Sequence, residues 1–348
     1  MSQIDFFSIV REAWNAYDPA APALTIEDIS AQVSTNHVYK VQLSSRRFVV
    51  GKVSYFGKYE HFREDHTIIN RLAKTIGPPY TRLLARALRR NGEVFTYRHR
   101  DAEHDVWVVF YNPVRIRKRF PRRLEPAEIE QFAREMAQFH RACAEATPEL
   151  PPSSKTLEWD IRELLALVTT EEWEHASSAD LDTIKEQCRL FLGNGEACHA
   201  DSFLKMPVFV DWNIGNFSLD QHGRLYSRWD YDWFRMAPRM LDFYFFSRVV
   251  SDIGDRTTFS YVVDTLMEPR FMLFLRAYHQ VYPLTANEVR FLKEAYRFFI
   301  LNYVVKYGRH FFRPRYAEQL QNEAFTRYFP EVDVRFDADP LLKGLSLL

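Results

Sequence analysis

Two short polar motifs near the middle of the chain carry residue types that can transfer a phosphoryl group. The first is Asp211-x-x-x-x-Asn216, and the second, Asp230-Tyr231-Asp232, begins fourteen residues after Asn216. A carboxylate can orient an attacking hydroxyl and accept its proton, while an amide oxygen and a second carboxylate can hold the Mg²⁺ that bridges the phosphates of ATP. The joint spacing therefore predicts Asp211 as the catalytic carboxylate, with Asn216 and Asp230 as ligands of Mg²⁺.

The segments around the two motifs predict how they meet. Residues 217–219 and 225–229 are apolar and β-prone, and they flank the polar turn 220–223, which ends in glycine. This pattern is typical of a β-hairpin. The hairpin would carry Asn216 and Asp230 to the same end of two paired strands, where their oxygens would suit a hard cation.

This stretch resembles the aminoglycoside phosphotransferase and choline kinase-like family, which are small-molecule kinases with a protein-kinase-like fold. The usual motifs of the family are H-G-D-x-x-x-x-N, I-D-W-D and G-D-P-x-x-D. Asp211 and Asn216 match the first motif, residues 229–232 resemble the second, and residues 237–242 resemble the third, with Asp242 at the family's spacing. The resemblance implies ATP and Mg²⁺ as cofactors and a small hydroxylated molecule as the acceptor.

The sequence departs from the family within the first motif. Phe209 stands where the family has histidine, and Val210 stands where it has glycine. In the family that histidine braces the catalytic loop and does not react, so its replacement concerns the rate more than the type of reaction. We expect Asp242 to hold the loop after Asp211 by hydrogen bonds, and Asp232 to support the metal ligands or to act as an auxiliary ligand.

The N-terminal part supplies the candidate nucleotide-binding residues. Strands are predicted at 36–43 and 48–53, and Lys52 on the second strand resembles the kinase lysine that reaches the α- and β-phosphates. The turn that ends at Asn36 stands where the family has its phosphate-covering loop. It carries no glycine, so any phosphate cradle around Asn36 must come from Ser and Thr hydroxyls and backbone N–H groups.

Apolar residues at helical spacing predict a helix over 59–76. In kinases a helix at this place supplies a glutamate that pairs with the strand lysine. Glu64 is our candidate for the partner of Lys52. Glu60 lies one turn earlier on the same face and is the alternative.

The apolar run 106–111 predicts a buried strand that turns at residues 112–113. A kinase hinge would pass beneath the adenine ring here and bind it through backbone N–H and C=O groups. We therefore place Val109, Phe110 and Tyr111 at the hinge. A plain core strand that leads into a loop is equally compatible with this pattern.

Composition limits the class of partner. Lys and Arg total 46 and Asp and Glu total 46, so the formal net charge is zero, whereas a dedicated nucleic-acid binder has a basic footprint. Three scattered cysteines fit unbridged thiols in a reducing cytoplasm. The first residues do not predict a signal peptide, and no apolar run reaches the roughly 18 residues of a membrane span. We expect a cytoplasmic protein that binds neither nucleic acid nor membrane, and the sequence leaves its oligomeric state open.

The pattern changes from strands to helices after residue 112. Together with the resemblance, this change predicts an α+β, bilobal protein-kinase-like fold. Residues 1–112 would form a nucleotide-binding lobe with an antiparallel sheet and one key helix, and residues 113–348 a larger helical lobe with the catalytic loop and the acceptor site. Helices are predicted over 126–145, 155–170, 180–194, 241–252, 257–282, 286–307 and 315–329. His140, within the first of these, is interpreted as a buried core histidine.

The residue types around the motifs favour a neutral or anionic acceptor. Aminoglycosides are polycations whose kinases need an acidic groove, whereas Arg228, Arg235 and Arg239 make this segment basic, as do three arginines between 309 and 315. Neighbouring aromatic residues could stack on a sugar or surround a quaternary ammonium. We expect a sugar, an amino alcohol, an amino acid such as homoserine, or a phosphorylated compound.

Two other functions are compatible with the sequence. The missing histidine and the glycine-free turn could mark a catalytically weak or inactive pseudokinase that binds nucleotide and acts as an interaction module. Against this, Lys52, Asp211, Asn216 and Asp230 are all present. A kinase that acts on protein Ser or Thr is disfavoured, because no Ala-Pro-Glu activation segment is recognisable.

Overall fold

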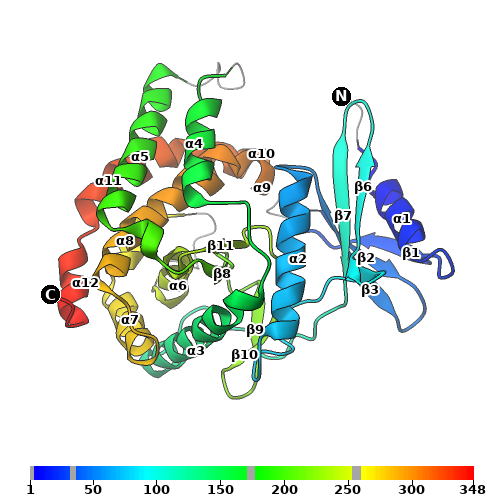
Figure 1. Cartoon of the computed structure of the whole chain (residues 1–348), viewed down its shortest axis with the longest axis horizontal. Helices are drawn as coiled ribbons and strands as arrows, with labels where there is room; N and C mark the ends of the chain where they lie inside the picture. Colours follow the sequence, from blue (N-terminus) through cyan, green and yellow to red (C-terminus); the bar gives the residue numbers. More distant parts are fainter. Residues whose placement is uncertain (1–3, 32–36, 171–176, 253–259) are drawn as a thin grey trace.

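The computed structural model describes residues 4–31, 37–170, 177–252 and 260–348. Figure 1 shows a sheet with α1 on one side, α2 between the sheet and the helical part, and the remaining helices gathered beyond α2. The predicted α+β class is confirmed. The call on Asn36 lies outside the described residues.

The sheet in the N-terminal part has five antiparallel strands in the order β1-β2-β3-β7-β6. Their bounds are β1 Thr25–Asp28, β2 His37–Gln42, β3 Phe48–Ser54, β6 Thr96–Arg100 and β7 Asp105–Tyr111. A two-residue ladder, β4 Arg89–Arg90 with β5 Glu93–Val94, flanks the turn Asn91-Gly92. An Asn-Gly pair between two strands is typical of such a hairpin turn.

The two faces of the sheet pack against different helices. Helix α1 (Phe6–Tyr17) covers one face, where Trp14 packs at 5.2 Å against the ring of Phe110. Helix α2 (Tyr59–Thr75) presents the buried residues Ile68, Ile69 and Leu72; the two isoleucines precede Leu72 by four and three residues, so all three share one face. Because side chains alternate along a strand, Val109 faces the opposite side from Phe110 and packs in the same core as α2.

The rest of the chain is mainly helical. The remaining helices are α3 Pro126–Ala146, α4 Leu157–Leu167, α5 Ser178–Ala197, α6 Phe243–Val250, α7 Pro269–Val281, α8 Ala286–Phe299, α9 Gly308–Phe311, α10 Pro314–Glu323, α11 Phe329–Arg335 and α12 Ala338–Gly344. Among the described residues, none of these helices combines the length and the apolar character that a bilayer crossing requires.

Several predicted helices have different bounds in the structure; the one expected over 315–329, for example, is α-helical to Glu323 and π-helical over Ala324–Tyr328. The helix expected over 257–282 begins only at Pro269, which fits the N-terminal preference of proline, and residues 253–259 lie outside the described part. The helix expected over 286–307 is α-helical to Phe299 and continues as a π-helix over Ile300–Lys306. Wider π-helical turns are rare and often occur at functional sites.

Two short antiparallel ladders carry the polar motifs. Strand β8 (Met206–Val208) pairs with β11 (Arg235–Ala237), and β9 (Phe217–Leu219) pairs with β10 (Leu225–Arg228). The loop between β8 and β9 contains Asp211 and Asn216, and the loop between β10 and β11 contains Asp230. Both loops are thus anchored at each end by paired strands.

Candidate functional site

The predicted hairpin is confirmed, and it brings the two motifs together. Phe217 pairs with Arg228, and the backbone N–H of Trp229 donates to the carbonyl oxygen of Asn216 at 3.1 Å. Asn216 and Asp230 therefore leave the same end of the hairpin. The connecting turn is held by Asp220, which accepts hydrogen bonds from the N–H groups of His222 and Arg224.

Asp211 is oriented by its own loop. Its Oδ1 accepts from the N–H of Asn213 at 3.1 Å, and its Oδ2 accepts from the side-chain amide of Asn216 at 2.9 Å. Burial, and after it the negative charge of Asp230, raise the pKa of Asp211 to about 6. The two carboxylates are therefore close enough to interact electrostatically.

Asp242 stabilises a strained turn immediately before Asp211. Val210 has a φ of 59°, in the left-handed region that costs a β-branched residue about 1–2 kcal/mol. One oxygen of Asp242 accepts from the N–H groups of Phe209 (3.0 Å) and Val210 (2.6 Å). The other oxygen lies 3.0 Å from His140, whose second nitrogen contacts Tyr278. Asp242 therefore holds the loop by hydrogen bonds as predicted, but before Asp211 rather than after it, and His140 is a buried core histidine.

Arg228 supports the catalytic loop in a way that we did not predict. Its guanidinium is buried between the rings of Phe209 and Trp212, with centroids at 4.7 and 4.5 Å, and it donates to the carbonyl oxygen of Asp211 at 3.0 Å. Cation–π contacts of this kind stabilise a desolvated guanidinium. The hint in the sequence is an arginine at the end of an apolar strand beside an aromatic-rich loop, which is a weak signal.

Lys52 lies against the second motif. Its ammonium group is 2.8 Å from Oδ1 of Asp230 and 2.6 Å from Oδ1 of Asp232. Burial opposes the charge on Lys52, but the two carboxylates outweigh it and raise the pKa of Lys52. Burial would also raise the pKa of Asp230, and the charge of Lys52 lowers it overall. The structure thus joins the N-terminal sheet to the motif segment through these ion pairs.

The expected pairing of Lys52 with Glu64 is wrong for this structure. Glu64 instead accepts hydrogen bonds at 2.7 Å from the hydroxyl of Ser153 and the N–H of Ser154. Glu60 pairs with Arg98 at 3.5 Å. Among the described residues, the carboxylates that pair with Lys52 are those of Asp230 and Asp232.

His66 occupies the side of α2 that faces the sheet. Its ring nitrogens contact the carbonyl oxygen of Phe62 at 2.7 Å and the hydroxyl of Tyr111. Burial lowers the pKa of His66 to about 4, with the charge of Lys52 acting in the same direction. His66 is therefore neutral at pH 7, and its ring links α2 to β7 through the hydroxyl of Tyr111.

The hinge assignment needs a shift in register. Val109 and Phe110 are interior positions of β7: Val109 pairs with both Lys52 and Thr96, and the carbonyl oxygen of Phe110 accepts from Leu88. Their backbone groups are therefore engaged in the sheet, and Tyr111 is the last residue of the strand. The alternative of a plain core strand fits Val109 and Phe110 better, and a hinge would begin after Tyr111.

The arginines that we expected around the acceptor are mostly structural. Arg228 and Arg239 are buried, and Arg239 is paired with Glu288 at 2.7 Å. Arg235 is also buried and bonds to Asp160 and, at 3.1 Å, to Tyr303. These side chains therefore do not give the site a basic surface, and they do not favour an anionic acceptor as we had expected.

The residues present fit a divalent cation. Because Asn216 donates its amide nitrogen to Asp211, its oxygen is directed elsewhere and remains a possible ligand. The Asp230 carboxylate contacts Lys52 through Oδ1 and keeps 31% of its side-chain surface exposed. Two hard oxygen donors beside a second carboxylate match the ligands of Mg²⁺, and a cation would relieve the repulsion between Asp211 and Asp230.

Comparison with known proteins identifies the fold. No family model and no curated protein matches the chain. Among solved structures, one described as amicoumacin kinase in complex with AMP-PNP, Ca²⁺ and Ami has a TM-score of 0.65 at 14% identity, over 97% of this chain and 98% of that chain. A microcompartment-associated aminopropanol kinase has a TM-score of 0.61 at 15% identity, over 98% and 99% of the two chains.

A third match extends the same likeness. Choline kinase from Streptococcus pneumoniae has a TM-score of 0.52 at 16% identity, over 99% of this chain and all of that chain. At these identities the likeness establishes a shared fold. The chain thus has the bilobal, protein-kinase-like fold of small-molecule kinases, as the sequence predicted.

Proposed function

We propose that this protein is a phosphotransferase that moves the γ-phosphoryl group of ATP to a hydroxyl of a small molecule. The observation that carries the proposal is the meeting of Lys52, Asp211, Asn216 and Asp230 at one place. They come from three separate segments of a fold that this chain shares with small-molecule kinases. Chance would rarely bring all four residues that this reaction uses to one place, whereas any one of them alone would be a weak sign.

Each residue has a role that follows from its contacts. Asp211, fixed by two hydrogen bonds, would orient the acceptor hydroxyl and take its proton. The hydroxyl oxygen would bond to the γ-phosphorus as the bond from that phosphorus to the β–γ bridging oxygen breaks, which releases ADP. Lys52 would contact the phosphates. Catalysis of this kind is mostly positioning and charge stabilisation.

Asn216 and Asp230 would hold Mg²⁺, which when bound neutralises the charge of the phosphates. The proposal also assigns the positioning of Lys52 to Asp232, at 2.6 Å, instead of to a glutamate of α2. Asp230 would then be free to exchange its contact with Lys52 for the cation. Asp232 is the more buried of the two carboxylates, with 12% of its side chain exposed, which suits a fixed structural partner.

The first test is a titration of the purified protein with ATP and Mg²⁺, followed by thermal denaturation. A ligand that binds the folded state alone stabilises it by about 2.7 kcal/mol at a hundredfold excess over Kd. We expect Mg²⁺-dependent stabilisation in the wild type and its loss in Asp230→Asn. An acceptor screen over sugars, amino alcohols and amino acids would follow, with release of ADP as the readout.

The same titration separates the kinase from the pseudokinase. Stabilisation by ATP and Mg²⁺ with no phosphoryl transfer to any acceptor, and with no slow ATP hydrolysis, would support a nucleotide-binding interaction module. Absence of any response to ATP or GTP, with Mg²⁺ or Mn²⁺, would overturn the assignment of the nucleotide site itself.

A further inference from the structure

A small cavity adjoins the pair formed by Lys52 and Asp232. Its volume is about 100 Å³, and its walls come from α2, from the loop after Asp230, from α4 and from the π-helical segment Ile300–Lys306. Asp232 is part of the wall, so the cavity begins beside the residue to which we assign the positioning of Lys52. Within the described residues, the polar groups of its wall are not all hydrogen-bonded.

Three buried polar atoms of the cavity wall have no hydrogen-bond partner among the described residues. They are Oδ1 of Asp65, Oδ1 of Asn302 and Nε of Arg235. The residues are 8%, 3% and 3% exposed. An unpartnered buried polar atom typically costs about 1–3 kcal/mol, and such atoms in native structures need an explanation.

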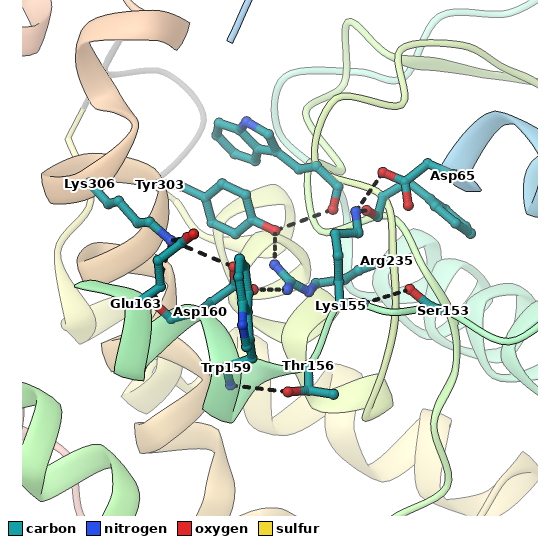
Figure 2. Close-up of polar contacts among 12 residues, drawn as sticks. Asp65, Ser153, Lys155, Thr156, Trp159, Asp160, Glu163, Arg235, Tyr303 and Lys306 are labelled. Atoms are coloured by element: carbon teal, nitrogen blue, oxygen red, sulfur yellow. Dashed lines mark hydrogen bonds and ion pairs between the residues drawn. The ribbon is translucent and has the colours of Figure 1, made fainter. Parts of the chain in front are cut away.

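The charges of the buried wall are already paired. Figure 2 shows Lys155 against Asp65 and Arg235 against Asp160, and Lys155 also donates to the carbonyl oxygen of Phe234 at 3.0 Å. Asp232 is paired with Lys52. A ligand with a net charge would therefore leave that charge without a partner in a buried place, which is costly.

The π-helical segment supplies part of this wall. It contributes Asn302 and Tyr303, and the hydroxyl of Tyr303 accepts from Arg235 at 3.1 Å and donates to the carbonyl oxygen of Trp233. Lys306, from the same segment, pairs with Glu163 of α4 at 2.6 Å (Figure 2). Polar contacts therefore hold the segment at Tyr303 and at Lys306. Asn302, whose amide oxygen has no hydrogen-bond partner among the described residues, is part of the cavity wall.

We propose that this cavity binds the non-reacting end of the phosphoryl acceptor, and that this end is a compact polar group without net charge. The group would donate hydrogen bonds to Asp65 and Asn302 and accept one from Arg235. Small polyols and zwitterionic hydroxy-amino acids both meet these requirements. A cavity of about 150 Å³ takes a benzene ring, so roughly six heavy atoms or fewer would fit here. The inference rests on the proposed function, because it places the ligand beside the phosphate-binding lysine.

The decisive variant is Asn302→Leu, which keeps the size of the side chain and removes the unpartnered oxygen. If Asn302 serves a ligand, the variant folds with an unchanged or higher melting temperature, because a buried unsatisfied atom is lost. The KM for the acceptor should rise at least tenfold, while the KM for ATP stays within twofold. Asn70→Leu is the matched control, since Asn70 is a buried asparagine of α2 outside this cavity.

Binding is measured separately from turnover by thermal shift with four probes: glycerol, L-homoserine, ethanolamine and kanamycin. We expect glycerol or L-homoserine to stabilise the wild type and Asn70→Leu but not Asn302→Leu. The cations ethanolamine and kanamycin should change the melting temperatures of all three proteins equally. A larger rise in melting temperature with glycerol would indicate a polyol, and a larger rise with L-homoserine would indicate a zwitterionic hydroxy-amino acid.

The outcomes separate the two proposals. An acceptor phosphorylated with equal KM by the wild type and Asn302→Leu would overturn the cavity assignment and leave the kinase proposal intact. Probe binding that depends on Asn302, in a protein that does not respond to ATP and Mg²⁺, would support a ligand site and overturn the kinase. No stabilisation by any probe, or equal stabilisation of the wild type and Asn302→Leu, would overturn the inference.

Discussion

The environment of Asp211 changes the pKa of its carboxylate in two ways that reinforce each other. Burial and the charge of Asp230 both raise its pKa, to about 6. A general base works best when its pKa lies near the working pH. The same environment that makes Asp211 costly to ionise therefore also suits it to accept a proton from a hydroxyl.

The pH dependence of catalysis should report this pKa. In the free enzyme kcat/KM for the acceptor should be constant above about pH 7 and fall about tenfold per pH unit below pH 6, because the protonated Asp211 cannot accept a proton. Asp211→Asn should lower kcat by about 10²–10⁴-fold and leave ATP binding nearly unchanged. Wild-type turnover in Asp211→Asn would contradict the mechanism.

Lys52 offers a second residue-scale prediction. Because Asp232 and not Glu64 holds Lys52, Asp232→Asn should weaken nucleotide binding about tenfold, whereas Glu64→Gln should change it less than twofold. The loss of one partner of a buried pair leaves the other partner uncompensated. Nucleotide affinity measured by calorimetry checks both variants. The reverse order of effects would restore the helix glutamate as the partner.

At the scale of elements, the catalytic loop depends on short ladders and one buried carboxylate. Strands β8, β9, β10 and β11 are each three or four residues long, and short ladders alone fix a loop weakly. Asp242 adds hydrogen bonds to two backbone N–H groups at the left-handed turn of Val210. The loop conformation is thus imposed by tertiary contacts on a residue that disfavours it.

Asp242→Ala should therefore destabilise the protein strongly. It would leave the N–H groups of Phe209 and Val210 and one nitrogen of His140 without partners, at about 1–3 kcal/mol each. We expect at least about 3 kcal/mol less free energy of unfolding in urea, with a smaller loss for Asp242→Asn. The exposed Asp201 provides a control, and Asp201→Ala should change the free energy by less than about 0.5 kcal/mol. A loss for Asp242→Ala no larger than that of the control would show that the brace is dispensable.

At the scale of the whole molecule, α2 belongs to the larger core. Its residues Ile68, Ile69 and Leu72 lie in the same buried cluster as the helices of the C-terminal part, whereas α1 packs in a smaller cluster on the far face of the sheet. His66 is buried at this junction between the sheet and α2. The global stability should therefore depend on the protonation of His66.

The sign of this dependence follows from the pKa. Because burial lowers the pKa of His66 from its ordinary value near 6.5 to about 4, the unfolded chain binds the proton first as the pH falls. The stability due to the neutral imidazole is present above pH 6.5 and lost as the pH falls through 4, by about 3 kcal/mol in total. Asp65 and Asp211, whose pKa values are raised to about 6, act in the opposite direction.

A variant isolates the contribution of His66 from those of the carboxylates. His66→Gln should be less stable than the wild type at pH 7.5, and the difference in the free energy of unfolding should shrink as the pH falls to 5. Urea denaturation of both proteins across this range measures it. A difference that does not vary with pH would mean that His66 does not change its protonation on unfolding in this range.

The sequence by itself determined the candidate reacting groups and the hairpin that joins them. Asp211, Asn216 and Asp230 were found from their types and spacing, and the polar turn between two β-prone runs was enough to place Asn216 beside Asp230, because hairpin pairing is local. The same holds for α2 and α3, whose periodic apolar residues define a helix without reference to distant contacts.

Only the tertiary structure decided which polar side chains meet across long separations. Successive residues of a helix point about 100° apart, so Glu64 and His66, which are two residues apart, point to nearly opposite sides of α2. Packing of α2 against the large core decides which of the two faces the sheet. Tertiary packing likewise decides that Arg228 and Asp242 contact the loop around Asp211. It also decides that Asp65 and Asn302 each keep a buried oxygen without a partner in the described part of the chain. Periodicity identifies a buried face, but the partner of each polar residue depends on where the other elements pack.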